Sequence, residues 1–268
     1  MEGYLSLSYG DLAVASMLIV VNAGLSVAFR LGMHRQLLVA AVRMVVQLWL
    51  VGQVLTTVFA LVSPFWTGMV ALVMLLFAGY EIGTRQHQRL AGIWAYGLGT
   101  GSMMLATTIV TLFALTTALR PEPWYDPRYL VPILGMLLGN CMTGISLGLD
   151  TLTTGLVNRR AAVEAQLMLG RMRRQAFQPV IRQALRSALM PITNAMAATG
   201  VVALPGMMTG QILGGVAPTD AVKYQLLIMF LIAGATGIGV VCAVMAAAWR
   251  LTDARHRLRL DRLVQSAA

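Results

Sequence analysis

Long apolar runs alternate with short basic segments along the whole chain. Runs without Asp, Glu, Lys, Arg or His cover residues 12–29, 44–80, 90–119, 130–149, 187–219 and 224–249. About 20 residues cross the hydrocarbon core of a bilayer. The run 44–80 would form a helix of roughly 55 Å, which is too long for one span. Pro64 offers a break, because the residue before a proline avoids helical geometry.

The run 187–219 is also too long for a single span. Pro205-Gly206 is expected to end the helix, because proline removes a backbone donor and disrupts helical geometry. Residues 205–215 are then expected to form a re-entrant or interfacial segment. The pattern therefore predicts seven transmembrane spans in an all-α, polytopic helical bundle.

Basic residues in the loops predict the orientation. With the N-terminus outside, most of the 20 basic residues fall on the inner side of the membrane. The inner set is Arg30, Arg35, Arg85, Arg89, Arg159, Arg160, Arg171, Arg173, Arg174, Arg182, Arg186, Arg250, Arg255, Arg257, Arg259 and Arg262. Only Arg120, Arg128 and Lys223 fall outside, and Arg43 lies within a span. Since cytoplasmic loops carry the excess of Lys and Arg, the C-terminus is expected in the cytoplasm.

Composition supports a membrane protein over a soluble one. Of the 268 residues 58% are hydrophobic and 11% are charged, and the mean hydropathy is +0.74. Soluble domains carry about 25% charged residues. The net charge of +10 is explained by the loop arginines, so no nucleic acid partner is expected. We expect one permease domain over residues 1–268 with the bilayer as its solvent.

The largest segment outside the predicted spans is residues 150–186. The stretch RRAAVEAQLMLGRMRRQAFQPVIRQALRSALMP (159–191) places Val163, Leu167 and Gly170 on one helical face. Gly170 is a plausible helix stop. This predicts a short amphipathic helix, a tight turn and a second helix that leads into span six. Such a helix either lies on anionic lipid or docks into a separate ATPase.

Several strings in the sequence match a known family. Glu164, Ala165 and Gln166 are followed, after three intervening residues, by Gly170, which resembles the Glu-Ala-Ala…Gly loop of ABC transporter permeases. The third position departs from that motif, and its later Leu-Pro appears as Met190-Pro191. The resemblance extends to GMLLGNCMTGISLGLD (135–150), ITNAMAA (192–198), LPGMMTGQILGG (204–215) and YQLLIMFLIAGAT (224–236). Over nearly its whole length the chain resembles the FetB-type family of iron-export ABC permeases.

The resemblance implies a permease subunit of an ATP-driven transporter that exports iron or another metal ion. It implies a FetA-like ATP-binding cassette subunit as partner and a location in the bacterial cytoplasmic (inner) membrane. It also implies no cofactor in this chain, with ATP used by the partner. The coupling residues would be Glu164, Ala165, Gln166, Gly170 and Arg171.

The absence of a phosphate-binding loop agrees with a separate motor subunit. Such a loop reads GxxxxGK[ST], and the only lysine in this chain, Lys223, follows Asp-Ala-Val. We therefore expect no enzymatic activity here. Seven helices are few for a complete pore, which indicates a homodimer. The alternative is an ATP-independent secondary carrier or channel for a small ion.

Polar residues inside the spans are candidates for the pathway or for gating. Charged residues within a membrane are costly and are usually paired or functional. Arg43 and Glu81 lie on adjacent antiparallel spans, where they form either a structural ion pair or part of a gate, and Gln47 could join either. Further candidates are Asn140, Thr143, Ser146, Asn194 and Gln211, which either line a pathway or hydrogen-bond between helices.

The sequence predicts no high-affinity metal site. The 18 methionines are expected to be mainly core or lipid-facing residues, and His34, His87 and His256 all fall outside the spans. The GxxxG pairs 135/139 and 144/148 allow close helix packing, within the chain or between copies. Gly144-Ile145-Ser146-Leu147-Gly148 also matches the GxSxG nucleophile pattern, so an intramembrane hydrolase is a third hypothesis. No histidine within a span supplies the base that such a serine needs.

Overall fold

A computed structural model of the chain describes residues 8–253 and 257–265; Arg255 and His256 lie outside these ranges. The described residues form helices with two short strands. The elements are α1 (Tyr9–Ala28), α2 (His34–Leu61), α3 (Pro64–Thr84), β1 (Gln88–Leu90), α4 (Ile93–Phe113) with a π-helical extension (Ala114–Leu119), α5 (Pro127–Asn158), α6 (Arg160–Met168), α7 (Arg173–Ala198), α8 (Gly206–Leu213), α9 (Pro218–Arg250), a 3-10 turn (Leu260–Arg262) and β2 (Leu263–Gln265). The chain divides into two compact units, Met1–Val62 and Ser63–Ala268.

The first unit is a pair of apolar helices, α1 and α2, that contact each other. α1 begins with a capping box, in which the Ser8 hydroxyl accepts a hydrogen bond from the Asp11 backbone N–H and the Asp11 carboxylate accepts one from the Ser8 N–H. This arrangement satisfies two of the backbone donors that every helix start leaves open. α2 ends at Leu61, and the residue after it, Val62, has a left-handed φ of +41°.

The break predicted at Ser63-Pro64 is confirmed. α2 stops at Leu61 and α3 starts with Pro64 as its first residue. Proline suits this position because its missing N–H would have no partner in the first turn. One uncharged run therefore forms two helices, as its length required.

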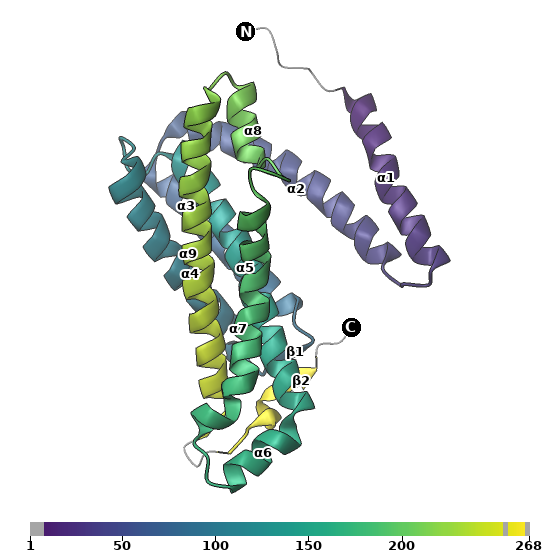
Figure 1. The fold of residues 1–268 in the computed structure, drawn as a ribbon. Helices are drawn as coiled ribbons and strands as arrows, with labels where there is room; N and C mark the ends of the chain where they lie inside the picture. The colour runs from purple at the N-terminus through teal and green to yellow at the C-terminus, as the bar shows by residue number, and fades with distance from the viewer. Residues whose placement is uncertain (1–7, 254–256, 266–268) are drawn as a thin grey trace. The chain divides into compact units, whose positions relative to one another are not determined.

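In the second unit α5 is the central helix. It packs against α3, α4, α7 and α9, and α7 and α9 also pack against each other (Figure 1). The core lies along these contacts and includes the fully buried Leu137, Cys141, Ile145 and Val240. The fold is thus an all-α polytopic membrane bundle, as the sequence predicted.

Glycines allow α5 to approach its neighbours closely. A methyl group added at Gly144 would lie 2.8 Å from the Thr236 side chain and 3.0 Å from Val240. One added at Gly148 would lie 3.1 Å from Val244 and 3.2 Å from the Ala188 side chain. The 144/148 pair therefore serves packing within the chain.

Six of the described helices are long and apolar enough to cross a membrane: α1, α2, α3, α4 with its extension, α5 and α9. These match six of the predicted spans. The helix in the place of the predicted sixth span, α7, does not meet this criterion. It starts at Arg173, far before residue 187, and carries Arg182 and Arg186. The total of seven spans and the orientation of the termini remain predictions.

Residues 205–215, expected to be re-entrant or interfacial, contain the two-turn helix α8, none of whose residues is buried. α8 packs on α9. Its depth in the membrane stays a prediction.

A two-stranded sheet, which the sequence analysis did not predict, ties the C-terminal segment to the bundle. β1 and β2 pair antiparallel, with Arg89 opposite Val264. Arg262 donates to the Arg250 carbonyl at 2.6 Å. Arg259 donates to Asp261 at 2.7 Å, and this hydrogen bond lowers the pKa of the Asp261 carboxyl to about 2. We call this end of the second unit, which carries α6 and the sheet, the basic end.

Candidate functional site

The predicted coupling segment is a helix, a tight turn and a second helix, as expected. α6 follows α5 after a single non-helical residue, Arg159. Val163 is 3% exposed and joins the core, and Leu167 packs partly buried against it. Glu164 accepts a hydrogen bond from Arg160 at 2.8 Å, one turn away. The apolar face predicted from the sequence therefore attaches α6 to the bundle.

Gly170 ends α6 by a specific hydrogen-bond pattern. The Gly170 N–H donates to the Leu167 carbonyl, and the Arg171 N–H donates to the Gln166 carbonyl, both at 3.1 Å. This is the Schellman arrangement, which requires a left-handed residue at the position of Gly170. Its φ is +80°. Glycine is favoured there because a Cβ atom would crowd the backbone, so the predicted helix stop is confirmed.

The turn after α6 presents apolar side chains to the surroundings. Met168 and Leu169 are each 82% exposed, and Met172 is 68% exposed. Ala165 and Arg171 are exposed as well, whereas the side-chain oxygen of Gln166 is buried without a hydrogen-bond partner in the described part of the chain. We call Met168, Leu169 and Met172 the apolar tip. The residues of the tip were not among the predicted coupling residues. A possible signal was present in the sequence, because these apolar residues lie next to Arg171, Arg173 and Arg174.

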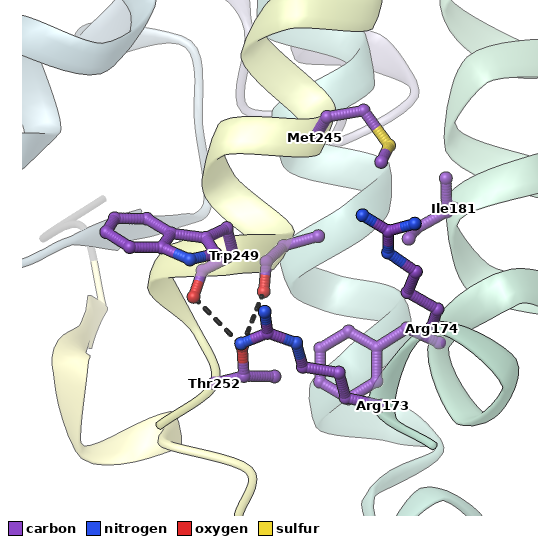
Figure 2. Close-up of a pocket in the computed structure, with 8 residues that line it drawn as sticks. Arg173, Arg174, Ile181, Met245, Trp249 and Thr252 are labelled. Atoms are coloured by element: carbon purple, nitrogen blue, oxygen red, sulfur yellow. Dashed lines mark hydrogen bonds between the residues drawn. The ribbon is translucent and has the colours of Figure 1, made fainter. Parts of the chain in front are cut away.

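A small hollow lies beside the coupling segment, between the start of α7 and the end of α9. Arg173, Arg174 and Ile181 line it from α7, and Met245 and Trp249 line it from α9 (Figure 2). The two arginines extend toward α9. No sequence pattern pointed to this hollow, because its walls are far apart in the chain.

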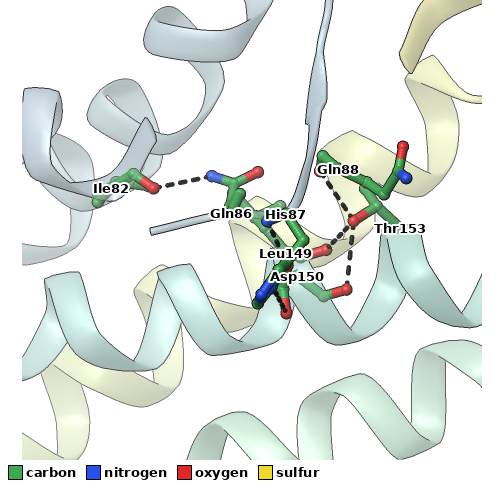
Figure 3. A network of polar contacts seen from close by, with 7 residues as sticks. All are labelled: Ile82, Gln86, His87, Gln88, Leu149, Asp150 and Thr153. Carbon is green, nitrogen blue, oxygen red and sulfur yellow. Dashed lines mark hydrogen bonds and ion pairs between the residues drawn. The ribbon is translucent and has the colours of Figure 1, made fainter. Parts of the chain in front are cut away.

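A polar network fixes the loop between α3 and α4 to α5. The backbone N–H of His87 donates to the Asp150 carboxylate at 2.8 Å, and the His87 ring lies 3.2 Å from the same oxygen (Figure 3). Thr153 donates to the Gln88 carbonyl at 3.0 Å. These bonds hold β1 in register for pairing with β2, so their role is structural.

The structure separates the three polar residues proposed on span five. Asn140 and Thr143 are exposed on α5, where they hydrogen-bond to carbonyls of their own helix. Ser146 is 5% exposed, and its hydroxyl has no hydrogen-bond partner among the described residues. Asn140 and Thr143 thus share an open face with Gly139, next to which no side chain lies within 4 Å of an added methyl group.

The exposed face of α7 is polar over most of its length. Gln178, Arg182, Arg186 and Thr193 recur at helical spacing and are all exposed, whereas Ala184 and Ala188 on the other side are buried. Asn194 is exposed near the end of the same helix. Gln211 on α8 is half-buried, with a side-chain oxygen that lacks a partner in the described chain. Arg182 and Arg186 were expected only as loop charges, although their spacing of four residues already placed them on one helical face.

Arg43 and Gln47 lie on α2 in the first unit, and Glu81 lies on α3 in the second. The Glu81 side chain is 14% exposed and lies 3.8 Å from Arg85, one turn later. The pairing of Arg43 with Glu81 remains a prediction.

A double-mutant cycle tests that pairing. If the two groups pair, Arg43→Gln and Glu81→Gln each lower the melting temperature, and the double variant is no worse than the more harmful single one. Losing one partner of an ion pair in a poorly solvated position costs about 3–5 kcal/mol, because the other charge is left uncompensated. Thermal unfolding of the purified protein in detergent gives the comparison. Strictly additive effects would show that the groups act separately.

Among the residues described, no three His, Cys, Asp or Glu side chains gather in a group that could hold a metal ion. Cys141 and Cys242 are both free thiols.

The sequence matches the model described as an uncharacterised protein family, UPF0014, over residues 9–251. A UPF0014 membrane protein of Synechocystis is 36% identical, over 85% of this chain and 86% of its own length. The UPF0014 membrane protein STAR2 of rice is 34% identical, over 90% of this chain and 85% of its own length. The protein named probable iron export permease protein FetB of Escherichia coli is 28% identical, over 94% of this chain and 95% of its own length.

No solved structure matches the chain. The family model covers nearly all of the second unit and most of the first. The Synechocystis and rice relatives are membrane proteins by name, which agrees with the apolar helices described above. With the matches to FetB and to the rice and Synechocystis proteins, the chain belongs to the FetB-type UPF0014 family of membrane proteins.

Proposed function

We propose that this chain is the membrane-spanning permease subunit of an ATP-binding cassette transporter and exports iron or another metal ion. The observation that carries the proposal is the α6 turn at the basic end. It is firmly attached to α5 and α7 on one side and presents the apolar tip on the other. The cargo is taken from the name of the FetB relative, a probable iron export permease.

The apolar tip suits a docking role. Met168 is the last residue of α6, Leu169 and Met172 follow it, and Arg171 lies among them. Exposed apolar groups that cluster on a polar surface mark contacts with another protein or with a membrane. Because α6 continues from α5 and leads into α7, a push on the tip would be transmitted to two helices of the core. An ATP-binding cassette subunit is the partner that this arrangement suits.

The motor is proposed to be another chain. Lys223 is the only lysine, and it pairs with Asp220 at 2.9 Å in the first turn of α9, outside any glycine-rich loop. A phosphate-binding loop needs a lysine that reaches the phosphates. ATP would therefore be hydrolysed by the partner subunit, and this chain would use no cofactor of its own.

The open polar faces of α5 and α7 suit a translocation pathway. Arginines within the depth of a membrane are costly unless they face water or another polar group. Arg186 lies on the exposed side of α7 with Thr193, and Asn140 lies on the exposed side of α5, which packs against α7. We propose that a second copy of the chain covers these faces, so that a homodimer encloses the pathway in the bacterial cytoplasmic membrane.

Transport in proteoliposomes tests the proposal. Vesicles that hold this chain and an ATP-binding subunit of the FetA type are expected to move ferrous iron only when ATP is supplied. A non-hydrolysable ATP analogue serves as the control and should give no transport. Iron movement by this chain alone, without nucleotide, would instead identify a secondary carrier or channel.

A further inference from the structure

The hollow between α7 and α9 combines two cationic side chains with an aromatic ring. Arg173 and Arg174 enter it from the first turn of α7, and Trp249 from the last turn of α9 (Figure 2). Its volume is about 100 Å³. Since one water molecule occupies about 30 Å³ in the liquid, the hollow has room for a phosphate group.

Neither guanidinium in the hollow is neutralised by the described part of the chain. Several arginines at the basic end do have acidic partners: Arg160 lies 2.8 Å from Glu164, and Arg257 lies 2.9 Å from Asp253. Within residues 8–253 and 257–265, Arg173 and Arg174 form no ion pair and no side-chain hydrogen bond. Each guanidinium offers five N–H donors. Two such groups at the start of a helix, where the backbone dipole is positive, favour an anion.

Aromatic residues place the hollow at the membrane boundary. Trp249 is 62% exposed and Trp94 is 42% exposed, and the Arg250 guanidinium lies 4.8 Å from the centre of the Trp94 ring. Tryptophan is enriched at the level of lipid headgroups because its ring is apolar and its N–H is polar. α9 extends from this level through a long apolar stretch. By this criterion the hollow lies at the level of the headgroups, and the exposed side of α9 beyond it faces acyl chains.

The wall of the hollow changes from polar to apolar toward the bilayer. Ile181 lies about two turns into α7 from Arg173, and Met245 lies one turn into α9 from Trp249. Both face the same hollow as the arginines. A ligand that matches this order has an anionic head and an apolar tail.

We propose that this hollow binds the phosphate headgroup of an anionic phospholipid, with its acyl chain against Ile181 and Met245. Basic pockets between helices on the cytoplasmic side of membrane proteins suit such headgroups. Because α7 follows directly from the coupling segment, a bound lipid would brace the start of α7 against α9. The inference does not depend on which ion is transported or on the ATP-binding partner.

Lipid binding to the purified full-length chain tests the proposal. The protein in detergent is mixed with dioleoyl phosphatidylglycerol or dioleoyl phosphatidylcholine, and bound lipids are counted by native mass spectrometry. We expect phosphatidylglycerol to bind preferentially. The variant Arg173→Gln/Arg174→Gln should bind it about 30-fold more weakly, because each basic residue near a membrane contributes about a five-fold preference for anionic lipid. Arg85→Gln/Arg89→Gln removes the same charge at the same end, outside the hollow, and should keep the wild-type preference.

Three outcomes would overturn the proposal. The first is an unchanged lipid preference in the Arg173→Gln/Arg174→Gln variant. The second is an equal loss in the Arg85→Gln/Arg89→Gln control, which would show general charge attraction. The third is displacement of phosphatidylglycerol by millimolar inorganic phosphate, which would identify a site for a small free anion. If the variant does not fold, the melting temperature of the wild-type protein tests the proposal instead. This temperature should rise with phosphatidylglycerol and not with phosphatidylcholine or inorganic phosphate.

Discussion

Replacing Met168 and Leu169 by aspartate is expected to abolish binding of the ATP-binding subunit and ATP-dependent transport. Both side chains are 82% exposed, so their loss removes no packing within the chain. In a protein interface, buried anchor residues contribute about 2 kcal/mol or more each. Two of them correspond to about 4 kcal/mol, or a roughly thousand-fold weaker complex. Pull-down of the partner subunit and transport in proteoliposomes measure the effect, while the melting temperature should stay unchanged.

A matched control exists at the other end of α7. Val201 and Val202 are also strongly exposed, at 91% and 84%, in the turn after α7. Val201→Asp/Val202→Asp introduces the same charges and should leave partner binding intact. Gly170→Arg is a second disruption of the coupling turn, because arginine is disfavoured at a φ of +80°. If both coupling-turn variants bind the partner and transport normally, the coupling role of this segment is wrong.

Replacing Gly144 by leucine is expected to destabilise the bundle strongly. Even the first added carbon would lie 2.8 Å from Thr236 and 3.0 Å from Val240, with the Ala188 carbonyl at 3.4 Å on a third helix. Overpacking of a close-packed interior costs about 1–3 kcal/mol or more. For a chain of this size, about 3 kcal/mol lowers the melting temperature by roughly 10 °C. Thermal unfolding in detergent, followed by loss of monodisperse protein, gives the measurement.

Gly139→Leu provides the control, because Gly139 is on the same helix and nothing lies within 4 Å of an added carbon there. This variant should unfold at a clearly higher temperature than Gly144→Leu, because it leaves the packing within the chain intact. In the proposed homodimer it should weaken the association of two copies, since Gly139 shares the open face with Asn140 and Thr143. An unfolding temperature of Gly144→Leu equal to that of Gly139→Leu would contradict the close packing of α5, α7 and α9.

Much of the backbone could be predicted because its determinants are local. The bilayer requires apolar helices of a limited length, so the run 44–80 had to form two helices. Pro64 indicated where the second of them begins. Gly170 had to end α6 because few other residues tolerate its left-handed conformation. The second helix after the Gly170 turn was predicted, and α7 is that helix, but its polar face was not predicted, because a search for apolar runs ignores a helix with arginines on one side only.

The tertiary structure alone decided what each helical face meets. The two GxxxG pairs look equivalent in the sequence, yet Gly144 is enclosed by α7 and α9 while Gly139 is open. Asn140 and Ser146 were both candidate pathway residues on span five, yet Asn140 is exposed and Ser146 is buried in the core. The β1–β2 pair and the hollow with Trp249 join segments far apart in the chain. Periodicity in the sequence determines which residues share a face, whereas the neighbour of that face depends on how all the helices pack together.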